Sequence, residues 1–132
     1  MHTFCTYCSA SKSLEEGDLP AIQRYLDPRI HKVHEAAYTL GLDFYILSGE
    51  YGLVTPDEPI PWYDHLLLTE EVGELVERMA AQIRQHYIEG IVYFTNSISD
   101  DSSLIPYRDA IVAACNRAPC SCTVVEVNLE DI

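Results

Sequence analysis

A carboxylate and a phenol follow directly on an apolar run, where both could do chemistry. Residues 44–47 are continuously apolar, and Ser48, Glu50 and Tyr51 follow them, interleaved with two glycines. Glycine permits unusual φ angles or a close approach of a ligand to the backbone. Glu50 can therefore serve as a general base, a nucleophile or an acceptor for a sugar hydroxyl. The competing interpretation is a strand-to-loop turn whose Glu50 is merely exposed.

More reactive side chains lie farther along the same connection. Residues 56–65 combine prolines, aromatic rings and acids. Prolines lower the entropy of the unfolded loop, so the side chains can be preorganised. Trp62 or Tyr63 could stack on a base, and Asp64 or His65 could move a proton. Equally, Trp62 can anchor the loop to the core and His65 can be structural.

Small polar residues and one lysine form a candidate anion site near the start of the chain. Residues 8–13 form a short polar loop that contains Ser9, Ser11 and Lys12. Small side chains let backbone amides approach an anion, and Lys12 can supply a countercharge. The glycines of a P-loop are missing, so a hydrophilic turn is the alternative. A nucleophilic Cys8 would need a nearby histidine or cation, and the sequence identifies none.

Strands that alternate with helices must position these loops. Strands are expected at residues 3–8, 43–48, 91–95 and 123–127, and helices at residues 19–26, 28–41, 69–83 and 106–116. This alternation predicts right-handed parallel crossovers. We therefore expect one α/β domain over residues 1–132. It is a three-layer sandwich with a mostly parallel sheet of about four strands and helices on both faces.

The expected fold also predicts where a ligand binds. In open sheets of this kind, ligands bind beyond the carboxyl ends of the strands. The loops at residues 9–13, 49–65 and 96–103 all follow strands, so they are expected to meet at one edge of the sheet. This convergence is the main reason to expect a binding site.

The composition is that of a globular domain with a strong acidic excess. The chain has 132 residues, 48% of them hydrophobic, and a net charge of −13. Non-specific nucleic-acid binding relies on lysine and arginine, so this charge disfavours direct DNA binding. A single nucleotide in a local pocket is still compatible, because backbone amides and one lysine suffice.

The sequence indicates neither a membrane segment nor a secretion signal. No apolar run reaches the ~18 residues that a membrane-spanning helix needs. The first residues lack the basic start and the apolar core of a signal peptide. We therefore expect a cytoplasmic protein without a membrane partner. Its oligomeric state does not follow from the sequence.

Four of the five cysteines are grouped in pairs. Cys5 and Cys8 form C-x-x-C, and Cys120 and Cys122 form C-x-C. Four thiolates can hold zinc. However, Cys5 and Cys8 lie in an expected strand, where residues three apart point to opposite faces. We therefore expect small buried hydrophobes without metal or cofactor, with zinc as the alternative.

The order of several motifs resembles an uncharacterised bacterial and phage domain family that is similar to the YaaA peroxide-stress proteins. The resemblance covers roughly residues 3–95. Its matching segments are residues 8–12, 25–29, 45–53, 56–57 and 61–64. The likeness to YaaA proteins is centred on Leu-Ser-x-x-Tyr-Gly-Leu at residues 47–53. Members commonly carry Ala-Lys where this chain has Gly49 and Glu50.

The resemblance implies an α/β domain with a site near seven residues: Ser11, Lys12, Ser48, Tyr51, Asp57, Tyr63 and Asp64. YaaA-like proteins are associated with DNA binding and oxidative stress, and their relatives occur near nucleobase-modifying systems. The resemblance therefore implies nucleobase or nucleotide chemistry.

Two functional hypotheses follow, and the sequence does not decide whether the protein is an enzyme. In the first, the protein processes a nucleotide, nucleoside or base. Ser9, Ser11, Lys12, Ser48, Tyr51, Trp62 and Tyr63 would bind it, and Glu50, Asp57 or Asp64 would supply the acid or base. In the second, the protein is a non-catalytic ligand sensor or a stress-linked interaction domain.

Overall fold

The apolar runs of the sequence form a five-stranded sheet in the computed structural model, which describes residues 2–128. The strands are β1 (His2–Tyr7), β3 (Asp43–Ser48), β4 (Gly52–Val54), β6 (Gly90–Thr95) and β7 (Ser121–Glu126), in the order β4-β3-β1-β6-β7. β1 lies parallel to both β3 and β6, and β6 lies parallel to β7. The parallel strands therefore all end at one edge of the sheet.

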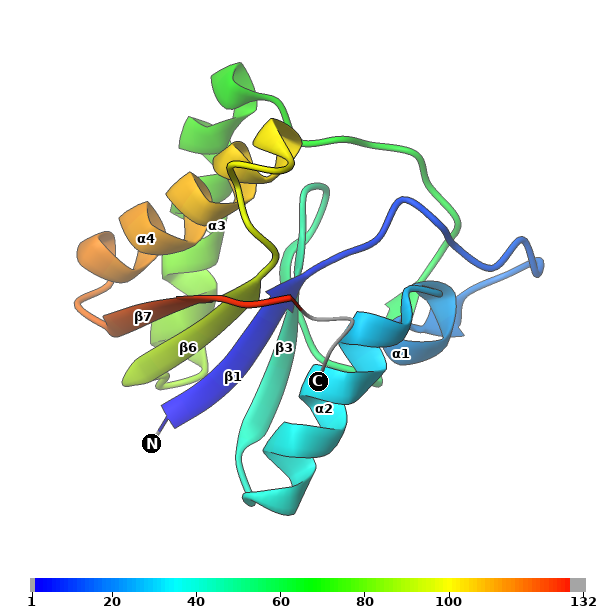
Figure 1. Cartoon of the computed structure of the whole chain (residues 1–132), viewed down its shortest axis with the longest axis horizontal. Helices are drawn as coiled ribbons and strands as arrows, with labels where there is room; N and C mark the ends of the chain where they lie inside the picture. The colour runs from blue at the N-terminus through cyan, green and yellow to red at the C-terminus, as the bar shows by residue number, and fades with distance from the viewer. Residues whose placement is uncertain (1, 129–132) are drawn as a thin grey trace.

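Helices cover both faces of this sheet (Figure 1). They are α1 (Ala21–Arg24), α2 (Pro28–Thr39), α3 (Val72–Gln85) and α4 (Ile105–Arg117), with short 3-10 turns at Thr69–Glu71 and Ser102–Leu104. α2 packs on β1 and β3, whereas α3 and α4 pack on one another across the opposite face. The expected α/β sandwich with a mostly parallel sheet is confirmed.

The expected strand count of about four is corrected to five. The additional strand, β4, lies in the long connection after β3 and pairs with β3 in the antiparallel direction. Gly52 opens it at a positive φ of 77°, and Gln82 of α3 bonds the backbone of Tyr51 and Leu53. Three residues are too few for a recognisable pattern, so tertiary contacts decide this strand.

A small second sheet braces the same connection. β2 (Leu19–Pro20) pairs in the antiparallel direction with β5 (Pro59–Ile60). This pairing joins the segment before α1 to the middle of the connection, although the two strands are distant in the chain. The segment that follows the first loop of the expected site is thereby held beside the second loop.

The fully buried Arg24 side chain fixes the segment between the first loop and β2. Its guanidinium donates to the carbonyls of Ser13 at 2.5 Å, Glu15 at 3.1 Å and Gly17, and to that of Ile60 at 3.1 Å. Planar guanidinium groups satisfy several acceptors at once. A loop with no regular structure is therefore built around one buried cation.

Replacing Arg24 with lysine should destabilise this part of the fold. A lysine side chain would keep the charge but leave carbonyls without donors, so Arg24→Lys should lower the free energy of unfolding by about 2–4 kcal/mol. Urea denaturation measures this change. Arg84→Lys is the control, because Arg84 is exposed, and its effect should stay within about 0.5 kcal/mol. Equal effects of both substitutions would contradict the role given to Arg24.

Candidate functional site

Three loops that are distant in the sequence line one cavity of about 480 Å³. Residues 7–12 form one wall, and residues 64–66 from the long connection form another. Asn96, Asp101 and Ser103 close it from the loop after β6. The cavity lies where the parallel strands end, as expected for this class of fold. It is called the Lys12 cavity below.

Lys12 is a nearly buried cation at the wall of this cavity, with 9% of its surface exposed. Its Nζ lies 4.5 Å from the ring centre of Tyr63 and 5.9 Å from that of Tyr25. Within residues 2–128, this Nζ forms no hydrogen bond or ion pair. Ring faces attract the charge but do not accept its three N–H groups in the way an oxygen does. The ammonium is therefore free to bind an anion in the cavity.

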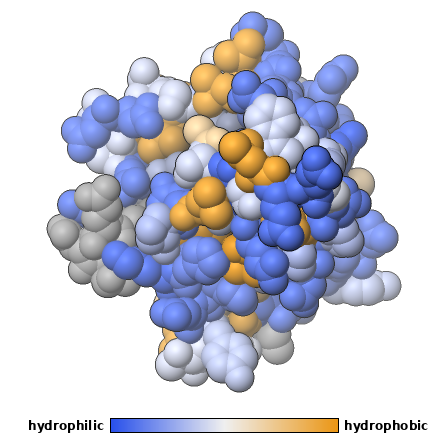
Figure 2. Space-filling model, turned by 90° about the vertical axis from the view of Figure 1, so that its right-hand side faces the viewer, coloured by the Kyte–Doolittle hydropathy of each residue, from blue (hydrophilic) through white to orange (hydrophobic). Residues whose placement is uncertain are grey.

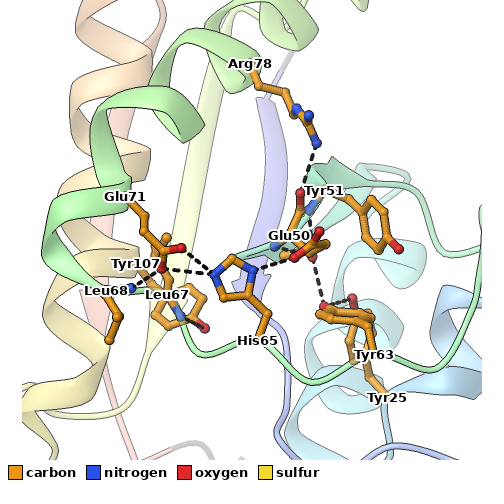
Figure 3. Close-up of polar contacts among 11 residues, drawn as sticks. Tyr25, Glu50, Tyr51, Tyr63, His65, Leu67, Leu68, Glu71, Arg78 and Tyr107 are labelled. Atoms are coloured by element: carbon orange, nitrogen blue, oxygen red, sulfur yellow. Dashed lines mark hydrogen bonds and ion pairs between the residues drawn. The ribbon is translucent and has the colours of Figure 1, made fainter.

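A chain of hydroxyl groups supports Lys12 from behind. The Ser48 Oγ accepts hydrogen bonds from the backbone N–H groups of Glu50 at 3.1 Å and Tyr51 at 3.0 Å. It also lies 2.9 Å from the Tyr63 hydroxyl, which lies 2.6 Å from that of Tyr25 (Figure 3). Burial raises the pKa of both Tyr25 and Tyr63, so both remain neutral phenols. Their rings thus hold Lys12 without neutralising it.

Arg29 also lines the Lys12 cavity, although sequence reasoning did not assign it to the site. Its buried guanidinium donates to the carbonyls of Tyr7 and Cys8, both at 2.5 Å, and to Thr6 Oγ1 at 3.2 Å. It also lies 3.4 Å above the Tyr7 ring and forms an ion pair with Asp27 at 3.4 Å. A cation in the first turn of a helix opposes the helix dipole. An arginine in the first turn of α2 is therefore unfavourable for the helix itself, and this feature of the sequence could have indicated that Arg29 has another role.

Tyr107 and Asn96 also hold the loops in place, and sequence reasoning did not assign either of them to the site. The Tyr107 hydroxyl of α4 accepts a hydrogen bond from the Leu67 N–H at 3.1 Å. Asn96 donates to the Tyr7 hydroxyl at 3.0 Å. Their partners come from distant parts of the chain, so no local pattern could reveal them.

His65 joins the long connection to α3 through two carboxylates (Figure 3). Its Nδ1 lies 2.5 Å from Glu50, and its Nε2 lies 2.9 Å from both Glu71 carboxylate oxygens. The Leu68 N–H also donates to Glu71, and Arg78 donates to the Glu50 carbonyl, both at 2.9 Å. Because both ring nitrogens face carboxylate oxygens, which only accept, the two contacts favour the doubly protonated imidazole. Glu71 and Glu50 accordingly raise the pKa of His65.

The structure gathers most of the expected ligand-binding residues. Four expected residues line the Lys12 cavity: Ser9, Ser11, Lys12 and Asp64. Ser48 and Tyr63 stand behind Lys12 in the hydroxyl chain, and the Tyr51 ring packs edge-on against Tyr63 at 5.3 Å. The Ser9 hydroxyl donates to the Ser11 carbonyl at 2.7 Å and so shapes the first loop.

Three expected residues lie elsewhere. Glu50 lines a separate cavity of about 210 Å³ beyond His65. Asp57 is exposed and does not line the Lys12 cavity. Trp62 lies with Leu14 in a shallow hollow of its own. Figure 2 looks toward the side of the molecule that carries these loops and shows apolar side chains scattered among hydrophilic ones.

The paired cysteines do not form a recognisable metal site. All five cysteines are free thiols, and Cys5, Cys8 and Cys115 are buried. Within residues 2–128, no group of three or more histidine, cysteine, aspartate or glutamate side chains is arranged to hold a metal ion. The same part of the chain contains no helix with the length and apolar character to cross a membrane.

Comparisons of the chain with protein-family models, with curated proteins and with solved structures found no match. The resemblance drawn from the motifs at residues 8–12 and 45–53 therefore stays a prediction.

The His65 bridge predicts a pH window for its contribution to stability. The raised pKa of His65 means that this contribution is full below pH 6.5 and is lost as the pH rises through the raised value. The pKa of Glu71 is lowered, mainly by His65, so its contribution is present above pH 4.5 and is lost as the pH falls through the lowered value. His65→Asn should therefore destabilise most between about pH 4.5 and 6.5.

Urea denaturation of the wild type and His65→Asn across this pH range measures the difference in the free energy of unfolding. His31→Asn is the control, because His31 is exposed on α2. A difference for His65→Asn that does not change with pH would contradict a charged bridge.

Proposed function

We propose that this protein binds a small anionic ligand of the nucleotide type in the Lys12 cavity. One observation carries the proposal, namely a lysine with 9% of its surface exposed that lines the cavity, whose Nζ faces two tyrosine rings and forms no hydrogen bond or ion pair within residues 2–128. Taking a charge out of water costs free energy unless a partner compensates. A phosphate at Lys12 would supply the oxygen acceptors that the ammonium lacks.

The size and chemistry of the cavity support the same class of ligand. A volume of about 480 Å³ falls in the range of small-molecule sites. Asp64 and Asp101 line the cavity together with Lys12, so the lining is not uniformly positive. Carboxylates accept hydrogen bonds from sugar hydroxyls or from the amino group of a base. We infer a ligand with an anionic group at Lys12 and donors that face the carboxylates.

The overall charge favours a small ligand over a polymer. A net charge of −13 repels a phosphate backbone at long range. Within the cavity, one lysine acts over a few ångströms, where a single phosphate can reach it. The five free thiols suit the reducing cytoplasm, which we propose as the location.

Asp64 is the best-placed candidate for acid–base chemistry, should the ligand be processed. It lines the Lys12 cavity, whereas Glu50 is bound to His65 beyond it. A carboxylate in reach of a glycosidic bond can move a proton or activate water. The alternative is a sensor that binds the same ligand without turnover.

Calorimetry with AMP and with adenosine tests the binding proposal. The wild type should bind AMP more tightly than adenosine, and Lys12→Met should lower the affinity for AMP by about 10- to 100-fold, because a hydrogen bond to a charged group contributes about 1.5–3 kcal/mol. The affinity for adenosine should change little.

Arg84→Gln provides the matched control, since it removes one positive charge from an exposed position on α3. It should leave both affinities unchanged. An equal loss in Arg84→Gln and Lys12→Met would mean that only the overall charge matters, and would overturn the assignment of Lys12.

Chromatography of nucleoside monophosphates after incubation separates catalysis from sensing. Release of free base should be lost in Asp64→Asn while AMP binding is kept. Asp57→Asn is the control, because Asp57 is exposed outside the cavity and should change neither property. Binding without any released base would favour the sensor.

A further inference from the structure

Three thiols gather at the edge of the sheet where the parallel strands begin. Cys115 lies in the last turns of α4, and Cys120 and Cys122 flank the first residue of β7. The Cys120 N–H donates to the Cys115 carbonyl at 2.8 Å, which brings the two backbone segments together. The Lys12 cavity lies beyond the other ends of the strands, so these thiols are no part of that site.

The fold directs Cys122 toward Cys115. Cys122 pairs with Ile91 of β6, a buried residue, and α4 packs on β7. Cys115 is fully buried on α4 and interacts with the Cys122 thiol. Cys120 also interacts with the Cys115 thiol, but more weakly than Cys122 does, and its sulfur donates to the Ser121 carbonyl at 3.4 Å. Cys122 is therefore the better neighbour for Cys115.

The Cys115 and Cys122 thiols differ in accessibility and in pKa, as the two thiols of a redox-active pair do. Cys115 is fully buried, whereas Cys122 is half-buried on the last strand of the sheet. The neighbouring Cys115 thiol lowers the pKa of Cys122, and the same interaction together with burial raises the pKa of Cys115. The more acidic and more accessible thiol reacts first with an oxidant, and an adjacent thiol can then resolve the product.

We propose that Cys115 and Cys122 form a reversible disulfide when a hydroperoxide oxidises Cys122. The Cys122 thiolate attacks the peroxide, the O–O bond breaks, and a sulfenic acid forms while the leaving oxygen takes a proton. The Cys115 sulfur then attacks the Cys122 sulfur and loses its proton. The S–O bond breaks and water leaves. Two thiols are thereby oxidised and the peroxide is reduced.

Intact mass spectrometry and peptide mapping after treatment with hydrogen peroxide test the proposal. The wild type should lose two hydrogens, the mapped bond should join Cys115 to Cys122, and a dithiol should restore the reduced mass. Cys120→Ser is the matched control and should form the same bond. In Cys122→Ser the bond should be absent.

Cys115→Ala provides the second variant, with circular dichroism to confirm that it folds. Without a resolving thiol, Cys122 should proceed to the sulfinic acid instead of the disulfide. Absence of a disulfide in the folded wild type, a bond between any other pair of cysteines, or equal sulfinic acid formation in the wild type and Cys115→Ala would each overturn the proposal. None of these outcomes bears on the Lys12 cavity.

Discussion

The buried guanidinium of Arg29 is the interaction on which the geometry of the site depends. Its position is fixed, because its donors meet the carbonyls of Tyr7 and Cys8 where β1 ends and the first loop begins. Backbone carbonyls at the end of a strand need donors when they are buried, and Arg29 supplies them here. Arg29 thereby connects the start of α2 to the end of β1, where the first loop begins.

Three cations, Lys12, Arg24 and Arg29, are buried in a protein whose net charge is −13. Both arginines donate to backbone carbonyls, which their planar, multiply donating groups suit, and Arg29 also contacts Thr6 and Asp27. They organise the loops around the site. Lys12 differs because its ammonium meets tyrosine rings instead of oxygens. The two arginines thus hold backbone segments in place, whereas the partners of Lys12 are ring faces, and this difference underlies the proposed anion-binding role of Lys12.

Much of the fold follows from local patterns. Apolar runs and helical stripes locate four of the five strands of the main sheet and the long helices, and their alternation predicts the parallel sheet. β4 and the pairing of β2 with β5 cannot be predicted from local patterns, because these strands are only two or three residues long. Four expected site residues line the cavity, and the sequence located them in polar loops that follow strands: Ser9, Ser11, Lys12 and Asp64.

The sequence by itself determined that loops 9–13, 49–65 and 96–103 would meet, because parallel strands present their carboxyl ends at one edge. Only the tertiary structure decided which of their side chains share a cavity. It bound Glu50 to His65, placed Trp62 beside Leu14, and brought in Arg29 and Tyr107 from helices. The physical reason is that strand direction is a local property of the chain, whereas the partner of a loop side chain depends on contacts between segments that are distant in the sequence.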